Sequence, residues 1–333
     1  MITIIKSGLL TSIQDLGRYG YQKYGIITSG AMDQLAHRIA NLLTGNDESQ
    51  ATLEITLIGP IIQFEEDALI SICGGDLTPM INGEVIPLWR SIFIKKGSKL
   101  SFGPCKSGCR AYLAVAGGFK VPDILNSKST YLRAGIGGFL GRALKSGDQL
   151  EIQEPSPLAK KMFQYLKNQL GSYTYKEMEW SITANLIPKY QNEQCIRVMK
   201  GREFELFTKE SRKKFFTERF GITVQSDRMG YRLKGPTLKL EKSGEMLSEA
   251  VSFGTIQVPS EGNPIVLLAD RQTTGGYPKI GQIASVDLPL VAQEKPGDTL
   301  TFSIISLKEA QQLYLKQEQA IQLLKRGIEL KFC

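Results

Sequence analysis

Residues 264–281 read Pro-Ile-Val-Leu-Leu-Ala-Asp-Arg-Gln-Thr-Thr-Gly-Gly-Tyr-Pro-Lys-Ile-Gly. The opening run, Pro264–Leu268, is short, apolar and β-branched, which predicts a buried strand rather than a helix. Polar side chains and two glycines follow it at once. Because a loop that leaves a rigid strand holds polar groups in fixed positions, the stretch predicts a β fold with a ligand site at the end of this strand.

Short β-rich runs recur about every ten residues along the rest of the chain, and turn residues separate them. The 333 residues include 33 glycines and are 42% hydrophobic and 22% charged, which is typical of a folded globular protein. This pattern predicts a mainly β chain built from barrels or sandwiches. The clearest runs are Ala68-Leu-Ile-Ser-Ile-Cys73, Ser91-Ile-Phe-Ile94, Ala111-Tyr-Leu-Ala-Val-Ala116 and Leu300-Thr-Phe-Ser-Ile-Ile305.

Three segments interrupt the strand pattern and predict helices. Met32–Leu43 places its apolar residues on one face, and Gly45 after it predicts a left-handed stop. Thr208–Phe220 is rich in charge and phenylalanine, and Gly221 predicts its end in the same way. The last helix opens with a capping-box pattern, Ser306-Leu-Lys-Glu309, and carries an apolar stripe typical of a core or of a contact between subunits.

The length favours two domains, because 333 residues exceed the size at which one hydrophobic core usually keeps growing. Between Glu154 and Gln194 the strand pattern gives way to prolines and to charged and aromatic residues without a clear period, which indicates a junction. The expected parts are a first β domain (1–155), a junction (156–194), a second β domain (195–305) and a C-terminal helix (306–333).

Similar phrases recur in the same order in the two halves, although their spacings differ. A duplicated β domain is one interpretation and chance similarity is the other, and superposition of the two domains' backbones would decide between them. The paired phrases are Ser29-Gly-Ala-Met32 with Ser226-Asp-Arg-Met229, residues 114–122 with residues 268–278, and Gly147-Asp-Gln-Leu150 with Gly297-Asp-Thr-Leu300.

The totals exclude several classes of function. No apolar run is long enough for a membrane helix and the first residues lack the features of an export signal, so we expect a cytoplasmic protein. Five cysteines, an odd number, suit reduced thiols. With His37 as the single histidine, we expect no histidine-rich metal site and no Ser-His-Asp hydrolase, but a core or surface histidine. The net charge of +8 is scattered, which favours a small anion or an acidic partner over nucleic acid.

The first candidate segment joins Gln14-Asp-Leu-Gly-Arg-Tyr-Gly20 to Ser29-Gly-Ala-Met-Asp33. Arg18 offers a planar fork for a carboxylate or phosphate, and the first amides of the expected helix would point at an anion near Ser29. The alternative is a glycine-rich turn in which Ser29 or Asp33 caps the helix.

A second segment, residues 127–142, contains Arg133 and four glycines, which again suggests backbone laid close to a ligand. It matches neither the P-loop pattern nor the dinucleotide-binding pattern. In the second half, Asp227-Arg228 and Asp270-Arg271 are two Asp-Arg dipeptides, each near a glycine and a tyrosine. Surface ion pairs are the alternative explanation for both.

The loop after Leu268 offers the most complete set of polar groups. We expect Asp270 to orient Arg271, and Thr273 and Thr274 to donate hydrogen bonds to a ligand oxygen. Gly275 and Gly276 would turn main-chain amides toward the ligand, and Tyr277 with Pro278 would end the turn.

These segments, in this order, closely resemble the family variously called the C subunit of 5-oxoprolinase, KipI antagonist (KipA) or allophanate hydrolase subunit 2, which is related to the carboxyltransferase domain of urea carboxylase. The resemblance runs from Ile4 to Phe302. Five motifs carry it: Gln14-Asp-Leu-Gly-Arg-Tyr-Gly20, Ser29-Gly-Ala-Met-Asp33, Ala114-Val-Ala-Gly-Gly118, Ser226-Asp-Arg-Met-Gly-Tyr-Arg232 and Asp270-Arg-Gln-Thr-Thr-Gly-Gly-Tyr-Pro-Lys279.

The resemblance implies two β-barrel domains of cyclophilin-like fold. It also implies partners, the smaller KipI-like B subunit and the A subunit of 5-oxoprolinase, with which the chain would open 5-oxoproline to glutamate in an ATP-dependent reaction. Whether ATP binds this chain stays open, and no biotin-accepting segment is seen, since Val198-Met-Lys-Gly201 departs from that pattern at its fourth position. Two alternatives remain: a regulator that binds and antagonises a KipI-type inhibitor of a sporulation kinase, and a carboxyltransferase component acting on a urea-like amide.

For lactam opening, an activated amide oxygen, a carboxylate and a transferred phosphate must all be stabilised. Arginines would neutralise the anions, threonines and glycine amides would hold the oxyanion, and an aspartate would position water. We therefore expect the catalytic residues to be Asp227, Arg228, Arg271, Thr273 and Thr274, and the substrate-binding residues to be Arg18, Ser29, Asp33, Arg133, Tyr231 and Tyr277.

Overall fold

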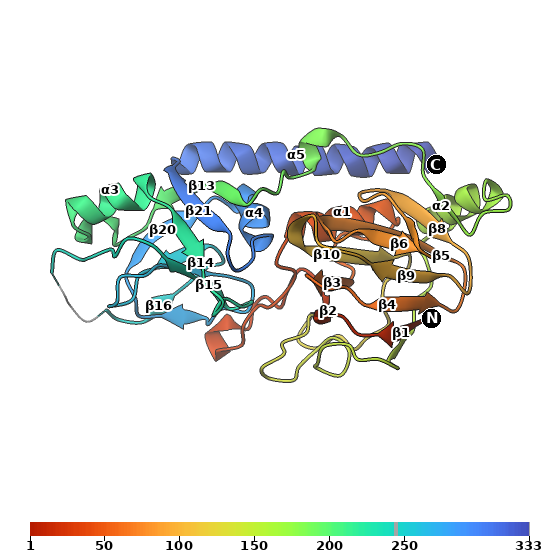
Figure 1. Cartoon of the computed structure of the whole chain (residues 1–333), viewed down its shortest axis with the longest axis horizontal. Coiled ribbons are helices and arrows are strands. Elements are labelled where there is room, and N and C mark those ends of the chain that lie inside the picture. Colours follow the sequence, from red (N-terminus) through yellow and green to blue (C-terminus); the bar gives the residue numbers. More distant parts are fainter. Residues whose placement is uncertain (243–245, 333) are drawn as a thin grey trace. The chain divides into compact units, whose positions relative to one another are not determined.

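The computed structural model describes residues 1–242 and 246–332 (Figure 1). The chain forms two compact units. The first comprises residues 1–18, 29–188 and those from 319 on, and the second comprises residues 19–28 and 189–318. The second unit therefore includes a short segment from the N-terminal part of the chain, and the last helix contributes to both units. The domain limits expected at residues 155, 195 and 305 stay a prediction.

The first unit contains two six-stranded sheets over a shared core. The first sheet has the order β11-β1-β4-β9-β6-β7 (Gln149–Leu150, Ile2–Lys6, Ile61–Phe64, Lys99–Phe102, Pro79–Ile81, Glu84–Val85). The second has the order β12-β8-β5-β10-β3-β2 (Tyr175–Glu177, Ser91–Ile94, Ala68–Asp76, Ser107–Val115, Thr52–Thr56, Leu10–Gln14).

Strand β10 shows why the second sheet reads as a continuous apolar run. Ala111 and Leu113 point into the core shared with the other sheet, whereas Tyr112 and Ala114 point to the opposite face, where helices cover them. Because both faces are buried, the strand lacks the alternation expected of a half-exposed one. The structure confirms the mainly β fold class.

Helix α1 (Gln34–Leu43) lies on the helix-covered face of that sheet and confirms the first predicted helix. Asp33 is its N-cap, and Gly45 follows with φ 71° as expected. Helix α2 (Pro157–Asn168) also packs there, although its residues were expected to form a junction without a helix. The signals were present, since Ser156 caps α2 and Pro157 occupies its first turn.

Ser156 gives α2 a measurable dependence on one side chain. Its hydroxyl accepts a hydrogen bond from Ala159 N at 3.0 Å and donates one to Gly45 O at 2.7 Å. We expect Ser156→Ala to lower the free energy of unfolding by about 1–2 kcal/mol, because two backbone groups lose their partner. Chemical denaturation followed by circular dichroism measures this. Ser49→Ala, in an exposed turn, is the control, and an equal loss in both variants would contradict the prediction.

The second unit is a closed barrel with the strand order β13-β20-β17-β18-β15-β14-β21. Strands β13 and β21 are parallel, and the other neighbours are antiparallel. The barrel strands are Glu193–Lys200 (β13), Lys279–Ile283 (β20), Thr255–Gln257 (β17), Ile265–Leu267 (β18), Gly230–Lys234 (β15), Phe220–Ile222 (β14) and Thr299–Ile304 (β21). Outside it lie β16 (Glu249–Ala250) paired with β19 (Thr274–Gly275), α3 (Lys209–Thr217) and α4 (Leu288–Ala292).

The predicted end of the second helix at Phe220 and Gly221 is wrong. Helix α3 stops at Thr217, and Phe220 begins strand β14. Phe220 is fully buried and packs against Phe302 with ring centroids 5.7 Å apart, so burial of an aromatic ring in the barrel outweighs one more helical turn. Gly221 is a strand residue paired with Lys234.

Helix α5 (Leu307–Phe332) confirms the third predicted helix and its cap. Ser306 N donates to Glu309 Oε2 at 3.0 Å and Glu309 N donates to Ser306 Oγ at 3.2 Å, which is the reciprocal pattern of a capping box. Four single turns of 3₁₀ helix complete the described elements: Gln22–Tyr24, Ala184–Leu186, Phe204–Leu206 and Ser285–Asp287. Of the helices in the described ranges, none is both long and apolar enough to cross a membrane.

The two units share a local pattern of backbone hydrogen bonds. Ile4 N donates to Asp148 O at 2.8 Å, and Ile222 N donates to Asp298 O at 2.9 Å. Both aspartates belong to the Gly-Asp-x-Leu phrase that recurs in the sequence, so the match supports the duplicated-domain interpretation. Two more bonds recur: Gly147 N to Ile4 O (2.8 Å) with Gly297 N to Ile222 O (3.1 Å), and Lys145 N to Asp148 Oδ2 (2.7 Å) with Lys295 N to Asp298 Oδ2 (3.0 Å).

Candidate functional site

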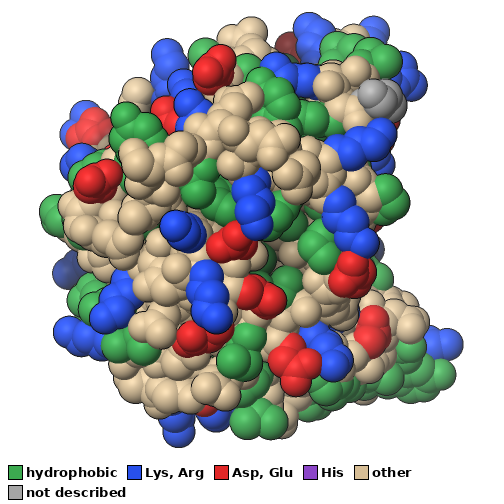
Figure 2. All heavy atoms as spheres, turned by 90° about the vertical axis from the view of Figure 1, so that its right-hand side faces the viewer, with side chains coloured by type: hydrophobic (Ala, Val, Ile, Leu, Met, Phe, Trp, Pro, Cys, Tyr) green, Lys and Arg blue, Asp and Glu red, His purple; other side chains and the backbone are tan. Residues whose placement is uncertain are grey.

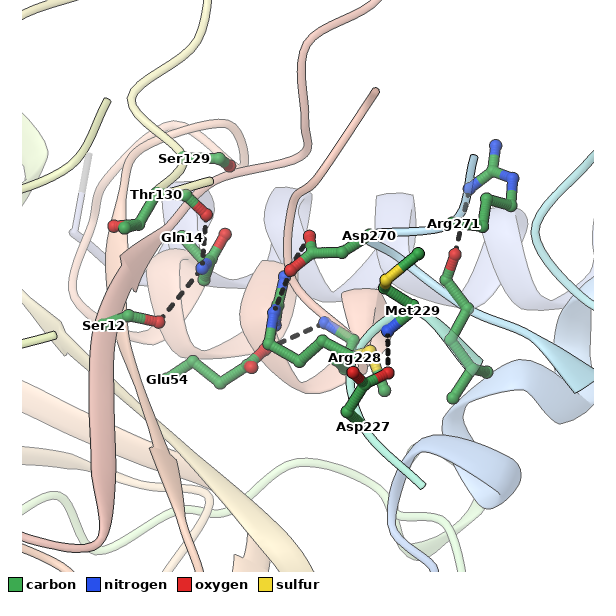
Figure 3. A network of polar contacts seen from close by, with 12 residues as sticks. Ser12, Gln14, Glu54, Ser129, Thr130, Asp227, Arg228, Met229, Asp270 and Arg271 are labelled. Atoms are coloured by element: carbon green, nitrogen blue, oxygen red, sulfur yellow. Dashed lines mark hydrogen bonds and ion pairs between the residues drawn. The ribbon is translucent and has the colours of Figure 1, made fainter. Parts of the chain in front are cut away.

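The two Asp-Arg dipeptides of the barrel unit meet through one buried ion pair (Figure 3). Arg228 Nε lies 2.9 Å from Asp270 Oδ2, and Arg228 Nη2 lies 3.1 Å from Asp270 Oδ1. The two residues are 5% and 6% exposed, so the alternative of a surface ion pair is wrong. The expectation that Asp270 orients its neighbour Arg271 is also wrong, because its carboxylate engages Arg228, which lies just before strand β15.

Strand pairing explains this crosswise contact. Gly230 of β15 lies opposite Leu267 of β18, and the ladder continues beyond both strands. Asp270 N donates to Arg228 O at 2.8 Å, which places the two side chains side by side as the chain leaves the barrel. A two-pronged guanidinium–carboxylate contact in a buried place is strong and directional. The pair therefore forms a rigid base for the loop that begins at Arg271.

Arg271 is the cation of this loop, and its hydrogen-bond partners in the described part of the chain are neutral. Nη1 lies 3.3 Å from Thr28 Oγ1 and 3.3 Å from Leu268 O, and Nε lies 3.4 Å from Val251 O. The guanidinium also lies 5.9 Å from the centre of the Phe253 ring. Burial lowers the pKa of Arg271, but an arginine remains charged at neutral pH. A partly desolvated cation held by neutral groups is suited to binding an anion.

The remaining loop residues differ in how they are held. Thr273 O accepts a hydrogen bond from Val251 N at 3.1 Å, and Thr274 is an exposed residue of β19. Tyr277 is 49% exposed and contributes to a cavity of about 520 Å³ on the barrel unit, together with Gly276 and Pro278. The loop thus presents one tyrosine ring and the edge of a short two-stranded sheet.

Two predicted residues of this unit have structural contacts. Asp227 is exposed, and its Oδ1 accepts hydrogen bonds from Met229 N at 2.7 Å and Gly230 N at 3.3 Å, which closes the turn before β15. Tyr231 is 2% exposed, and its hydroxyl donates to Glu294 O at 2.8 Å. Neither contact points to a ligand.

In the first unit, Arg18 holds a neighbouring loop. It is fully buried, with Nε 3.1 Å from Ile124 O and Nη2 2.9 Å from Ser129 O. Gly137 covers the guanidinium, since a Cβ there would lie 2.9 Å from Nη2. These bonds tie residues 15–18 to residues 124–137. Arg133, in contrast, is exposed on the tip of that loop.

Asp15, which was not among the predicted site residues, links its own turn to residues 127–129. Its carboxylate is 7% exposed and accepts hydrogen bonds from Gly17 N at 2.8 Å, Ser127 Oγ at 2.8 Å, Lys128 N at 2.5 Å and Ser129 Oγ. The available signal was an aspartate two residues before a glycine, which is typical of a side chain that closes its own turn. The donors that lie far away in the sequence could not be read from it.

In the Ser29–Asp33 turn, Asp33 has the capping role that the alternative gave to Ser29 or Asp33. Asp33 caps α1, because its Oδ1 accepts a hydrogen bond from Ala36 N at 2.9 Å. Ala31 N donates to Asp15 O at 2.8 Å. Ser29 itself has φ 53°, is 4% exposed, and its hydroxyl has no hydrogen-bond partner among the described residues.

Comparison with known proteins places the chain in a family. The family described as "Carboxyltransferase domain, subdomain A and B" matches residues 24–304. The chain belongs to this carboxyltransferase family. Both Asp-Arg dipeptides and the Ser29–Asp33 turn lie inside the matched range.

Two relatives of this carboxyltransferase chain match it over nearly its full length. The C subunit of 5-oxoprolinase from Haemophilus influenzae is 37% identical over 332 residues, which are 99% of this chain and 100% of that protein. The C subunit of 5-oxoprolinase from Escherichia coli is also 37% identical and covers 96% of this chain and 95% of its own. The resemblance stated from the motifs is confirmed.

A solved structure of the same family has a larger architecture. The urea carboxylase of Kluyveromyces lactis superimposes with a TM-score of 0.87 at 31% identity, over 98% of this carboxyltransferase chain. The chain spans only 29% of that protein, so the match supports the fold and not the activity of the whole protein.

Of the core and surface positions expected for His37, the structure shows the core position. His37 is fully buried, with Nδ1 2.9 Å from Thr52 Oγ1, and burial lowers its pKa to about 4. Among the described residues, Cys73, Cys105, Cys109 and Cys195 are not joined in disulfide bonds. In the described ranges, no group of three or more His, Cys, Asp or Glu side chains is arranged to hold a metal ion.

His37 makes stability depend on pH in a defined window. The unfolded state takes up a proton below pH 6.5, but the folded state does so only near pH 4, so falling pH favours unfolding between these values. We expect the wild type to lose about 3 kcal/mol relative to His37→Gln between pH 7 and pH 4. Urea denaturation across this range measures the difference. Parallel pH profiles of the two proteins would contradict the prediction.

The surface charge agrees with the expectation of scattered charge. Figure 2 shows lysines and arginines interspersed with aspartates and glutamates on the face that it displays, with no single basic area. Nucleic-acid binding proteins instead gather basic side chains on one face. The arginines that matter for the candidate site, Arg228 and Arg271, are withdrawn from this kind of surface.

Proposed function

We propose that the chain is the C subunit of an ATP-dependent 5-oxoprolinase, which opens 5-oxoproline to glutamate together with the A and B subunits. The observation that carries the proposal is the 37% identity to two proteins of that name over almost their whole length. This chain matches nearly the whole length of these two relatives, whereas it matches only a part of the urea enzymes.

The barrel unit supports this proposal with a suitable cation. 5-Oxoproline carries a carboxylate, and activation of its lactam oxygen by phosphate would add further negative charge. Arg271 is partly desolvated and held by neutral groups, so it is suited to either anion. Arg228 is already neutralised by Asp270 and would shape the site beside it. We propose that Thr273 and Thr274 assist at the oxyanion, that Tyr277 borders the substrate and that Asp227 positions water.

We propose mainly structural roles for the candidate residues of the first unit. The contacts of Arg18 and Asp33 described above hold a loop and cap a helix, so we assign them support of Ser29 rather than direct contact with substrate. Arg133, at an exposed loop tip, is proposed as an outer contact. ATP acts at the level of the complex in this proposal, since the sequence holds no P-loop pattern.

Reconstitution tests the function directly. The purified A and B subunits are mixed with or without this chain, and glutamate release from 5-oxoproline is measured with and without ATP. We expect release only when all three proteins and ATP are present. Release without this chain, or no release with it, would refute the proposal.

A carboxyltransferase component is the second candidate, because the structural match to urea carboxylase covers 98% of the chain at a TM-score of 0.87. Such a reaction needs a biotin-carrying partner, and avidin blocks biotin. Inhibition of the reconstituted reaction by avidin, or ATP hydrolysis stimulated by urea rather than by 5-oxoproline, would favour this candidate.

A further inference from the structure

Three successive amides of the Ser29–Asp33 turn are fixed by groups from other parts of the first unit. Besides Ala31 N, which donates to Asp15 O, Met32 N donates to Glu54 Oε2 at 2.9 Å and Asp33 N donates to Tyr112 Oη at 2.7 Å. The Tyr112 hydroxyl in turn donates to Glu54 Oε2 at 2.8 Å. We refer to Glu54 and Tyr112, with the two amides that they hold, as the Glu54–Tyr112 clamp.

The clamp is built on two interior strands of the second sheet. Tyr112 of β10 lies directly opposite Glu54 of β3, in the interior of the second sheet. Their exposed fractions are 0% and 1%. Burial, followed by the nearby Glu54 and Asp33, raises the pKa of Tyr112 well above its usual value, so the phenol stays protonated and keeps donating to Glu54. Figure 3 shows Glu54 beside Ser12, its neighbour across β2 and β3.

Ser29, the first residue of the clamped turn, has an unfavourable backbone conformation and an unfavourably buried hydroxyl. A left-handed backbone is uncommon for a residue with a side chain, and a buried hydroxyl without a partner costs about 1–3 kcal/mol. Ser29 has both features. The turn is tightly packed at the next residue, since a Cβ on Gly30 would lie 3.0 Å from Gly17 Cα. Strain of this kind persists only where neighbouring structure imposes it, and it concentrates at functional sites.

We propose that the Ser29 hydroxyl donates a hydrogen bond to an oxygen of the substrate, a small acid with a carboxylate and a lactam carbonyl, and that Glu54 and Tyr112 are positioning residues that hold Ser29 for this contact. The substrate class rests on the proposed function. The clamp fixes the amides of Met32 and Asp33, and these fix the direction of the turn that presents Ser29. A hydroxyl held in advance loses little freedom when the ligand arrives, which is how binding groups gain strength.

A double-mutant cycle in the reconstituted complex tests the contact. We expect Ser29→Ala to raise KM for 5-oxoproline about tenfold, the loss of one hydrogen bond to a charged or polarised oxygen. Tyr112→Phe should raise KM in the same way, because the turn loses the partner of Asp33 N. If Tyr112 acts through Ser29, the KM of the double variant is no higher than the larger of the two single-variant KM values. Multiplicative effects of the two substitutions would overturn the proposal.

Thr52→Val is the matched control. Thr52 lies on β3 two residues before Glu54, on the same face and fully buried, but its hydroxyl contacts His37 rather than the turn. We expect this variant to lose stability and keep its KM. If Thr52→Val raises KM as much as Tyr112→Phe does, loss of any buried polar group disturbs the site. That result would overturn the positioning role of Tyr112.

Hydrogen exchange tests the clamp without substrate. In the full chain, we expect Tyr112→Phe to accelerate amide exchange in a peptide covering residues 29–36 about tenfold or more, because Asp33 N loses its acceptor. Exchange in strand β1 serves as the internal control. Unchanged exchange at 29–36 would overturn the clamp even if the complex is active. A wild-type complex that turns over no 5-oxoproline would instead overturn the proposed function and the substrate contact of Ser29.

Discussion

Arg271→Ala is expected to lower ATP-dependent glutamate release by the reconstituted complex about 100- to 1,000-fold, the range found when a donor to developing negative charge is removed from an active site. The physical reason is that Arg271 is a partly buried cation whose partners in the described part of the chain are carbonyls, a hydroxyl and a ring. None of these partners carries a negative charge, so an anionic ligand would interact with a guanidinium that no carboxylate neutralises. Steady-state kinetics of the reconstituted complex measures the loss.

Two variants make this result specific. Arg271→Lys keeps the charge but not the planar fork, and we expect it to restore only part of the activity. Arg202→Ala removes an exposed arginine of the same unit, one paired with Glu249, and should leave the rate nearly unchanged. If Arg271→Ala is as active as the wild type, Arg271 has no part in the mechanism.

Asp270→Ala is expected to lower the free energy of unfolding of the chain by about 3–5 kcal/mol, the largest stability effect that we predict. Removing the carboxylate leaves the Arg228 guanidinium buried at 5% exposure without its two-pronged partner. A buried charge that loses its partner lowers the stability strongly, because the protein interior solvates it poorly. Chemical denaturation followed by circular dichroism measures the loss.

The double variant Arg228→Met/Asp270→Leu separates charge from packing. Replacing both residues by apolar ones removes the buried guanidinium together with the carboxylate, so we expect the double variant to be more stable than Asp270→Ala. Glu151→Ala breaks the exposed pair with Lys120 and should leave the stability nearly unchanged. A double variant less stable than Asp270→Ala would show that the pair itself, rather than unpaired charge, governs the stability of this region.

Much of the fold follows from local pattern. The β-rich runs, a helix ending at Leu43 and the capping box at Ser306 were predicted, because side-chain period and caps depend on residues a few positions apart. Helix α2 was missed although its cap is equally local, since the aromatic and charged residues around it hid its short apolar stripe.

The errors have a common physical cause. The end of α3 was misplaced because Phe220 is recruited into the barrel by Phe302, which lies far away in the sequence. Asp270 was assigned to its neighbour Arg271, but strand register delivers it to Arg228. In both cases a contact between distant segments outweighs a local preference, and the sequence carries no direct record of that contact.

The amino-acid sequence by itself determined that this chain is mainly β, where helices α3 and α5 begin, and which motifs carry its family resemblance, because these depend on neighbours along the chain. Only the tertiary structure decided which aspartate neutralises which arginine, which arginine is left with neutral partners, and that Glu54 and Tyr112 hold the turn at Ser29. Strand register and burial set those relations. Both arise when segments far apart in the sequence pack together, which is when a side chain acquires its charge environment and its partners.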